Sequence, residues 1–119
     1  MDINKMMASI KANPDYGNAG MVLYHNGIVR NTSRDGRPVT GLRVRVDREK
    51  LKAILEKYRK RPGIVDIQVE INAEHDLQVG DDVMLLAVAG DVRENVISTL
   101  SDTLNAIKTT VTDKTEFFT

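Results

Sequence analysis

The chain has 119 residues, 41% hydrophobic and 29% charged, and its 17 basic and 17 acidic side chains leave no net charge. This globular composition predicts one domain over residues 1–119, and the lack of cysteine excludes disulfides, thiolate metal sites and cysteine nucleophiles. No stretch has membrane length and two histidines are few for a zinc site, so we expect a soluble, cytoplasmic protein without metal, cofactor or membrane partner.

The first elements in chain order are a short helix and two strands. Apolar residues at helical spacing after a capping Asp2 predict a helix that stops before Pro14. The apolar segment 20–31 predicts a strand, with a possible bulge at Gly27. In 39–46, apolar residues alternate with arginines, which predicts a strand with one covered and one wet face.

The second half of the chain repeats this alternation of helix and strand. Asp47 caps a predicted helix that ends near Arg61, and segment 64–71 alternates as a strand. The unbroken apolar run 83–90 predicts a central strand covered on both faces. A last helix is predicted from about residue 92 to 108, with its inward face formed by Val96, Ile97, Leu100, Leu104 and Ile107.

The order α-β-β-α-β-β-α predicts an α+β fold, a two-layer sandwich of helices on a mostly antiparallel sheet. At the start of the last helix, Asp91 and Glu94 have the spacing of a capping box with Asp91 as the cap. Arg93 between them either pairs with these acids or helps the free N–H groups of the helix to hold a phosphate. The spacing alone favours the salt bridge.

A second group of basic residues follows the first strand. Arg30 closes that strand, Asn31 follows, and the next turn holds Arg34 and Arg37. Planar guanidinium groups around one turn could clamp a phosphate, although exposed turn residues are usually only solvated. Lys108 at the end of the last helix either complements the helix dipole or, in a partly desolvated pocket, acts as nucleophile or proton shuttle.

The remaining candidates have weaker patterns. His25 lies in an apolar strand and is expected to be packed in the core, and His75 has neighbouring acids that splay apart rather than converge on a metal. Residues 43–61 hold nine basic and three acidic side chains, but they lack the interleaved aromatic residues of a nucleic-acid-binding motif. We therefore expect no nucleic acid, and keep binding through this basic face as an alternative.

Three segments in order resemble the large, catalytic subunit of molybdopterin synthase. They are GMVLYHNGIVRN (20–31), VGDDVMLLAVAGDVREN (79–95) and TLNAIKTTVTDKTEF (103–117). The register can be followed from about Ala19 to Phe117. The resemblance implies a hammerhead-like sandwich of helices on an antiparallel sheet, which agrees with the order of elements above.

The resemblance also implies an activity and partners. Enzymes of this family are homodimers in which each large subunit binds a small ubiquitin-like sulfur carrier, giving a heterotetramer. The carrier's C-terminal Gly-Gly thiocarboxylate delivers sulfur to cyclic pyranopterin monophosphate to form molybdopterin. The resemblance makes Lys108 and Lys114 catalytic, and Arg30, Asn31 and Arg93 the residues that bind the anionic substrate.

The chain departs from the family pattern at several positions. The family's histidine before Arg93 is Val92 here, and its second catalytic lysine falls on Thr115, one position from Lys114. The alternative function is therefore a degenerate relative that binds a partner or an anion without catalysis. The sequence gives Phe117 and Phe118 two possible roles, an interface anchor or a frayed tail.

Overall fold

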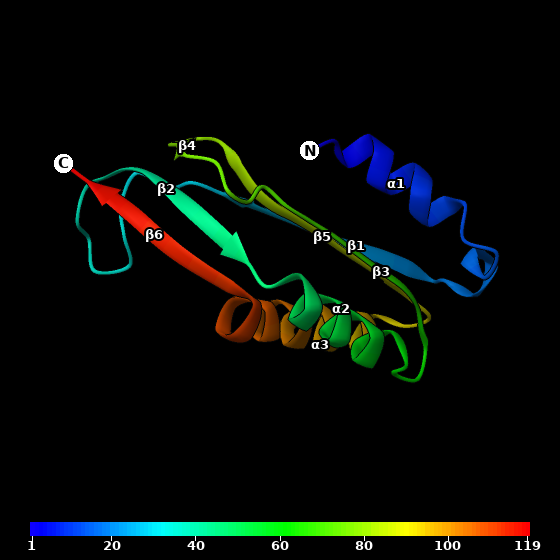
Figure 1. The fold of residues 1–119 in the computed structure, drawn as a ribbon. Helices are drawn as coiled ribbons and strands as arrows, with labels where there is room; N and C mark the ends of the chain where they lie inside the picture. Colours follow the sequence, from blue (N-terminus) through cyan, green and yellow to red (C-terminus); the bar gives the residue numbers. More distant parts are fainter.

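The computed structural model describes residues 1–119, which form two three-stranded sheets and three α-helices (Figure 1). The helices are α1 (Ile3–Lys11), α2 (Arg48–Arg59) and α3 (Arg93–Ala106), and α3 continues into a π-helical turn, Ile107–Val111. The strands are β1 (Met21–Ile28), β2 (Val39–Val46), β3 (Ile64–Ile71), β4 (Leu77–Gln78), β5 (Asp82–Gly90) and β6 (Thr112–Phe118). The predicted α+β class with antiparallel pairing is confirmed, but the strands form two sheets rather than the one sheet that was predicted.

Strand β5 is the centre of the first sheet, whose order is β1-β5-β3, as its unbroken apolar run predicted. Because side chains alternate along a strand, β5 feeds two cores. One face packs against α1, and the other packs against α2 and α3 (Figure 1). The register of β1 on β5 shifts between Gly27 and Ile28, which confirms the predicted bulge at Gly27.

The second sheet, β4-β2-β6, lies beside α2 and α3 on the same side of the first sheet (Figure 1). Its apolar residues Leu42 and Val44 join the core formed by α2, α3 and β5. Strands β4 and β6 were not predicted from the sequence. The segment 112–118 has little apolar alternation, and it becomes a strand by pairing with the edge of β2, from Val46↔Thr112 to Val39↔Phe118.

The beginning of α3 differs from its prediction in two ways. Val92, not Asp91, is the N-cap, and no side chain caps the helix, so the predicted capping box is wrong. Asp91 Oδ1 instead accepts hydrogen bonds from the Val92 N–H at 2.6 Å and from Asn95 Nδ2 at 2.9 Å. The bond from the Asn95 amide is the main reason that the pKa of Asp91 is lowered.

The buried stripe of α3 is also rotated from its predicted position. Ile97 was predicted to face inward, but 52% of it is exposed, whereas Thr99 and Thr103 are buried. Positions 96, 99, 103 and 107 follow the three-to-four-residue spacing of one helix face, and Ile97 lies about 100° away from Val96. None of the helices combines the length and the apolar character needed to cross a lipid bilayer.

Candidate functional site

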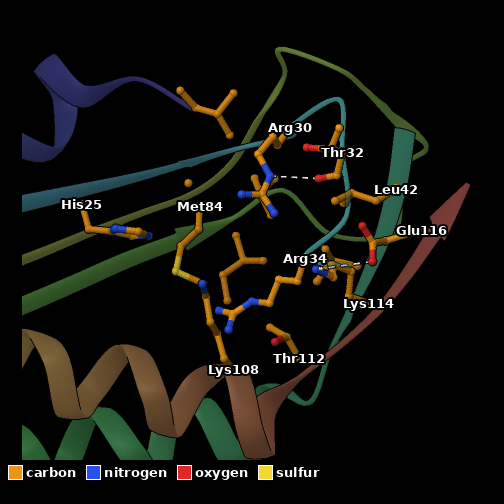
Figure 2. Close-up of a pocket in the computed structure, with 15 residues that line it drawn as sticks. His25, Arg30, Thr32, Arg34, Leu42, Met84, Lys108, Thr112, Lys114 and Glu116 are labelled. Carbon is orange, nitrogen blue, oxygen red and sulfur yellow. Dashed lines mark hydrogen bonds and ion pairs between the residues drawn. The ribbon is translucent and has the colours of Figure 1, made fainter. Parts of the chain in front are cut away.

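A cavity of about 480 Å³ lies between the two sheets and is lined by residues from both. His25 and Gly27 of β1 and Met84 of β5 form its wall on the first sheet. Leu42 of β2 and Lys114 of β6 are part of the opposite wall (Figure 2). The cavity therefore depends on both sheets, and residues far apart in the sequence meet in it.

The charged groups of the cavity are mostly cations. Arg30, Arg34, Lys108 and Lys114 line it together with a single carboxylate, Glu116. Lys114 Nζ lies 3.9 Å from Glu116 Oε1, and the other three cations form no ion pair with any acidic side chain. An excess of unpaired positive charge in a concave site favours an anionic ligand, and guanidinium groups are suited to phosphate or carboxylate oxygens.

The loop between β1 and β2 holds the two arginines in place. Arg30 Nε donates a hydrogen bond to the Thr32 carbonyl at 2.9 Å, which leaves its terminal nitrogens free for a ligand. The hydroxyl of Ser33 donates to Asp35, a bond that lowers the pKa of this carboxyl, and it accepts from the Arg37 N–H at 3.1 Å. The loop is thus cross-linked by its own side chains, and Figure 2 shows Arg34 pointing into the cavity.

Lys108 projects into the cavity from the π-helical turn that follows α3 (Figure 2). Ile107 and Val111, at the two ends of this turn, are buried and anchor it in the core. The hydroxyls of Thr109 and Thr110 donate to the carbonyls of Asn105 and Ala106 at 2.8 and 2.6 Å. π-turns often occur at functional sites because they change the direction of a side chain within a helix. Lys108 is directed to the cavity in this way.

His25 lies on the cavity wall rather than entirely within the core. Its pKa is lowered, first because burial disfavours the charged imidazolium and second because the Lys108 ammonium repels it. Gly27 leaves space beside it, since a Cβ at this glycine would come within 3.5 Å of His25 Nε2. The imidazole is therefore neutral at pH 7 and faces open space in a cationic cavity.

Two of the residues predicted to bind an anion lie elsewhere. Arg93 does not line the cavity; its Nε lies 3.3 Å from Glu94 Oε1, and its side chain is 78% exposed. It is at the far end of the 14-residue α3, about 20 Å along the axis from the π-turn. Asn31 does not line the cavity either, and its carbonyl accepts a hydrogen bond from the Val39 N–H at 2.9 Å.

The structure also changes which other residues belong to the site. Lys114 lines the cavity and the neighbouring Thr115 does not, because alternate residues of β6 face opposite sides. Arg34 was placed at the turn but not selected for the site, and His25 was expected in the core. The cluster of arginines in the turn after β1 was a signal for Arg34, but no local signal marked His25, because the pairing of β2 with β6 encloses the space that they share.

Three of the nine basic residues in segment 43–61 have partners within the protein, and most of the others are exposed. Arg43 Nη1 lies 3.1 Å from Asp76, and Arg61 Nη2 lies 2.8 Å from Asp102. Arg59 donates to the carbonyl of Ile67 at 2.6 Å. No group of three or more histidine, aspartate or glutamate side chains gathers in a way that could hold a metal ion.

Comparisons with known proteins give a consistent result. Residues 1–110 match the family described as MoaE protein. No curated protein matches the chain. Similar solved structures include molybdopterin synthase from Staphylococcus aureus, with a TM-score of 0.73, 23% identity and coverage of 86% of this chain and 77% of that one.

Two further structures cover 99% of this chain. The molybdopterin biosynthesis MoaE protein from Burkholderia ambifaria has a TM-score of 0.77 at 17% identity, with 83% of its own chain covered. A complex of subunits 1 and 2 of molybdopterin-converting factor from Helicobacter pylori has a TM-score of 0.73 at 19% identity, with 84% of the matched chain covered. At these identities, the solved structures show a shared fold.

Proposed function

The chain belongs to the family of MoaE proteins, the large, catalytic subunits of molybdopterin synthase, and on that basis we propose that it makes molybdopterin by sulfur transfer. The sulfur donor is the C-terminal Gly-Gly thiocarboxylate of a small ubiquitin-like carrier, and the acceptor is cyclic pyranopterin monophosphate. The family places the chain in molybdenum cofactor biosynthesis. The donor, the acceptor and the roles of the residues are the proposal.

The observation that carries the proposal is the charge of the cavity. Both reactants are anionic, one through its phosphate and the other through its thiocarboxylate. Four cationic side chains and one carboxylate line the space that would receive them, and both proposed catalytic lysines are among the four. In a partly desolvated site, such fixed charges stabilise an anion more strongly than they would in water.

The position of each cation in the cavity suggests its role in the proposed reaction. Arg30 and Arg34, held by the loop after β1, bind the phosphate through their guanidinium groups. Lys108, which has no ion-pair partner, is the reacting lysine, as nucleophile or proton shuttle. Lys114 is positioned by its ion pair with Glu116 on β6, and its ammonium group stabilises the negative charge of the carrier's C-terminal thiocarboxylate.

The partners follow from the same proposal. The Helicobacter pylori relative forms a complex of two different subunits, which supports a small carrier subunit for this chain as well. We also propose a homodimer. Arg93 lies outside the cavity of its own chain, at the start of α3. In a homodimer, Arg93 of one chain could reach the cavity of the other and bind the anion there. Asn31 acts through its backbone, by closing the loop that carries Arg30.

Reconstitution tests the sulfur transfer. The purified chain is mixed with a thiocarboxylated carrier and cyclic pyranopterin monophosphate, and molybdopterin is detected by the fluorescence of its oxidised product. We expect product only when all three components are present. Carrier binding without product would support the alternative of a degenerate relative that binds its partner without catalysis. The four cations of the cavity favour the catalytic function, since a relative that only bound the carrier's tail would not need a basic cavity.

A further inference from the structure

His25 is the one titratable group of the cavity that the proposed reaction does not use. It lies on β1, and its imidazole faces the same space as the four cations (Figure 2). The Gly27 position beside it has no side chain, so Nε2 is accessible from the cavity. A neutral imidazole in that position neither neutralises an anion nor adds to the repulsion among the cations.

The charges that face His25 come from several elements of the fold. Lys108 of the π-turn repels the imidazolium, and the loop arginines and Lys114 add positive charge across the cavity. Glu116 of β6 is the only opposing charge on the lining. Helix α3 also packs on β1, but its charged side chains lie outside the cavity. Arg93 forms an ion pair with Glu94, and Asp102 forms one with Arg61. Asp82 of β5 does not line the cavity.

An anion in the cavity reverses this balance. A doubly charged oxyanion held by the arginines and Lys108 offsets the repulsion from Lys108, which is the smaller of the two causes that lower the His25 pKa, and it offers the buried imidazolium an acceptor for its N–H, which compensates part of the burial. We propose that His25 takes up a proton when a doubly charged oxyanion enters the cavity, and thereby becomes a fifth cation and a hydrogen-bond donor of the anion site. The inference rests on the proposed anion-binding cavity, but not on sulfur transfer.

Proton uptake has a thermodynamic consequence that can be measured. If binding raises the midpoint of His25 titration by about 0.7 pH unit, the protonated protein binds the anion roughly fivefold more tightly than the neutral one. The affinity for the anion therefore rises as the pH falls through the titration of His25. Replacing this histidine with glutamine, which keeps a polar side chain but does not titrate, removes the pH dependence.

Sulfate is the probe, because its charge of −2 is constant from pH 5 to 8 and phosphate would itself titrate in this range. The chain contains two histidines, and His75 lies in an exposed loop outside the cavity. NMR titration of the two imidazole resonances, in sulfate and in chloride of equal ionic strength, follows each histidine separately. His25→Gln and His75→Gln assign the signals, and calorimetry measures sulfate affinity at pH 5.5 and 7.5.

We expect sulfate to raise the midpoint of the His25 resonance relative to chloride and to leave that of His75 unchanged. Wild type and His75→Gln should bind sulfate about threefold more tightly at pH 5.5 than at pH 7.5, because His25 of the free protein is only partly protonated at pH 5.5, and His25→Gln should lose this difference. Sulfate binding with an unmoved His25 midpoint would overturn the inference and leave the anion-binding cavity intact. A wild-type chain that does not bind sulfate at either pH would overturn both.

Discussion

Lys108→Ala removes the cation that we assign to the chemistry, and the structure sets the size of both its effects. The side chain is exposed to the cavity and forms no hydrogen bond or ion pair, so its loss changes the free energy of unfolding by less than about 0.5 kcal/mol. A positioned acid–base or nucleophilic group accelerates its reaction by at least about 100-fold, which is about 2.7 kcal/mol of activation free energy. We therefore expect activity to fall by this factor or more in a fully folded protein.

The assay is the single-turnover formation of molybdopterin with saturating carrier, combined with urea unfolding of each variant. Lys52→Ala is the matched control, because Lys52 is an exposed lysine of α2 outside the cavity, and it should leave both measurements unchanged. Lys108→Arg keeps the charge but not a readily titrated amine, and thus separates electrostatic stabilisation from nucleophilic or proton-transfer chemistry. Full activity in Lys108→Ala would refute the assignment.

Three other predictions concern stability. Gly63 and Gly36 both have a positive φ, of +80° and +85°, so replacing either with alanine should cost about 1 kcal/mol in urea unfolding. At Gly63 the new Cβ would also displace the Asp91 carboxylate from its hydrogen bonds with Val92 and Asn95, so Gly63→Ala should cost more, about 2–3 kcal/mol in all. Because the folded-state pKa of His25 lies below its usual 6.5, wild type should lose stability as the pH falls below about 6.5; a His25→Gln variant with the same slope down to pH 5 would contradict this. Arg93→Ala breaks an exposed pair with Glu94 and should change stability by less than about 0.5 kcal/mol; a larger loss by thermal unfolding would mean that Arg93 has a structural partner elsewhere.

The sequence predicted best where its pattern had one physical explanation. The apolar run of β5 required cover on both faces, and the structure supplies it with α1 on one face and α2 and α3 on the other. Gly27 indicated a bulge because a glycine within a strand has no side chain to pack. In contrast, the capping box at Asp91 failed because the same carboxylate had another partner, Asn95, one turn further along the helix.

The site was harder to predict because it depends on pairing between distant segments. The sequence pattern marked Arg30 and Lys108 one at a time and the family resemblance added Lys114, but nothing local showed that β6 would lie beside β2 and bring Lys114 over the cavity. The preference for a salt bridge at Arg93 agrees with its pairing to Glu94. His25 was assigned to the core on its apolar neighbours alone, because alternation along β1 does not reveal whether the facing layer is packed or open.

The pairing of β2 with β6 has a consequence for the order in which the protein folds. Residues of these strands lie about 70 positions apart, as between Val46 and Thr112, and β1 and β5 are nearly as distant, whereas β3 and β5 are joined through a short connection. Closing such long loops is slow relative to forming local structure, so β3 and β5 have the opportunity to pair before β1 joins them and before β2 pairs with β6. Lys114 would then reach the cavity only when β2 and β6 have paired, and a chain arrested before that step would have no enclosed cavity in which to bind an anion.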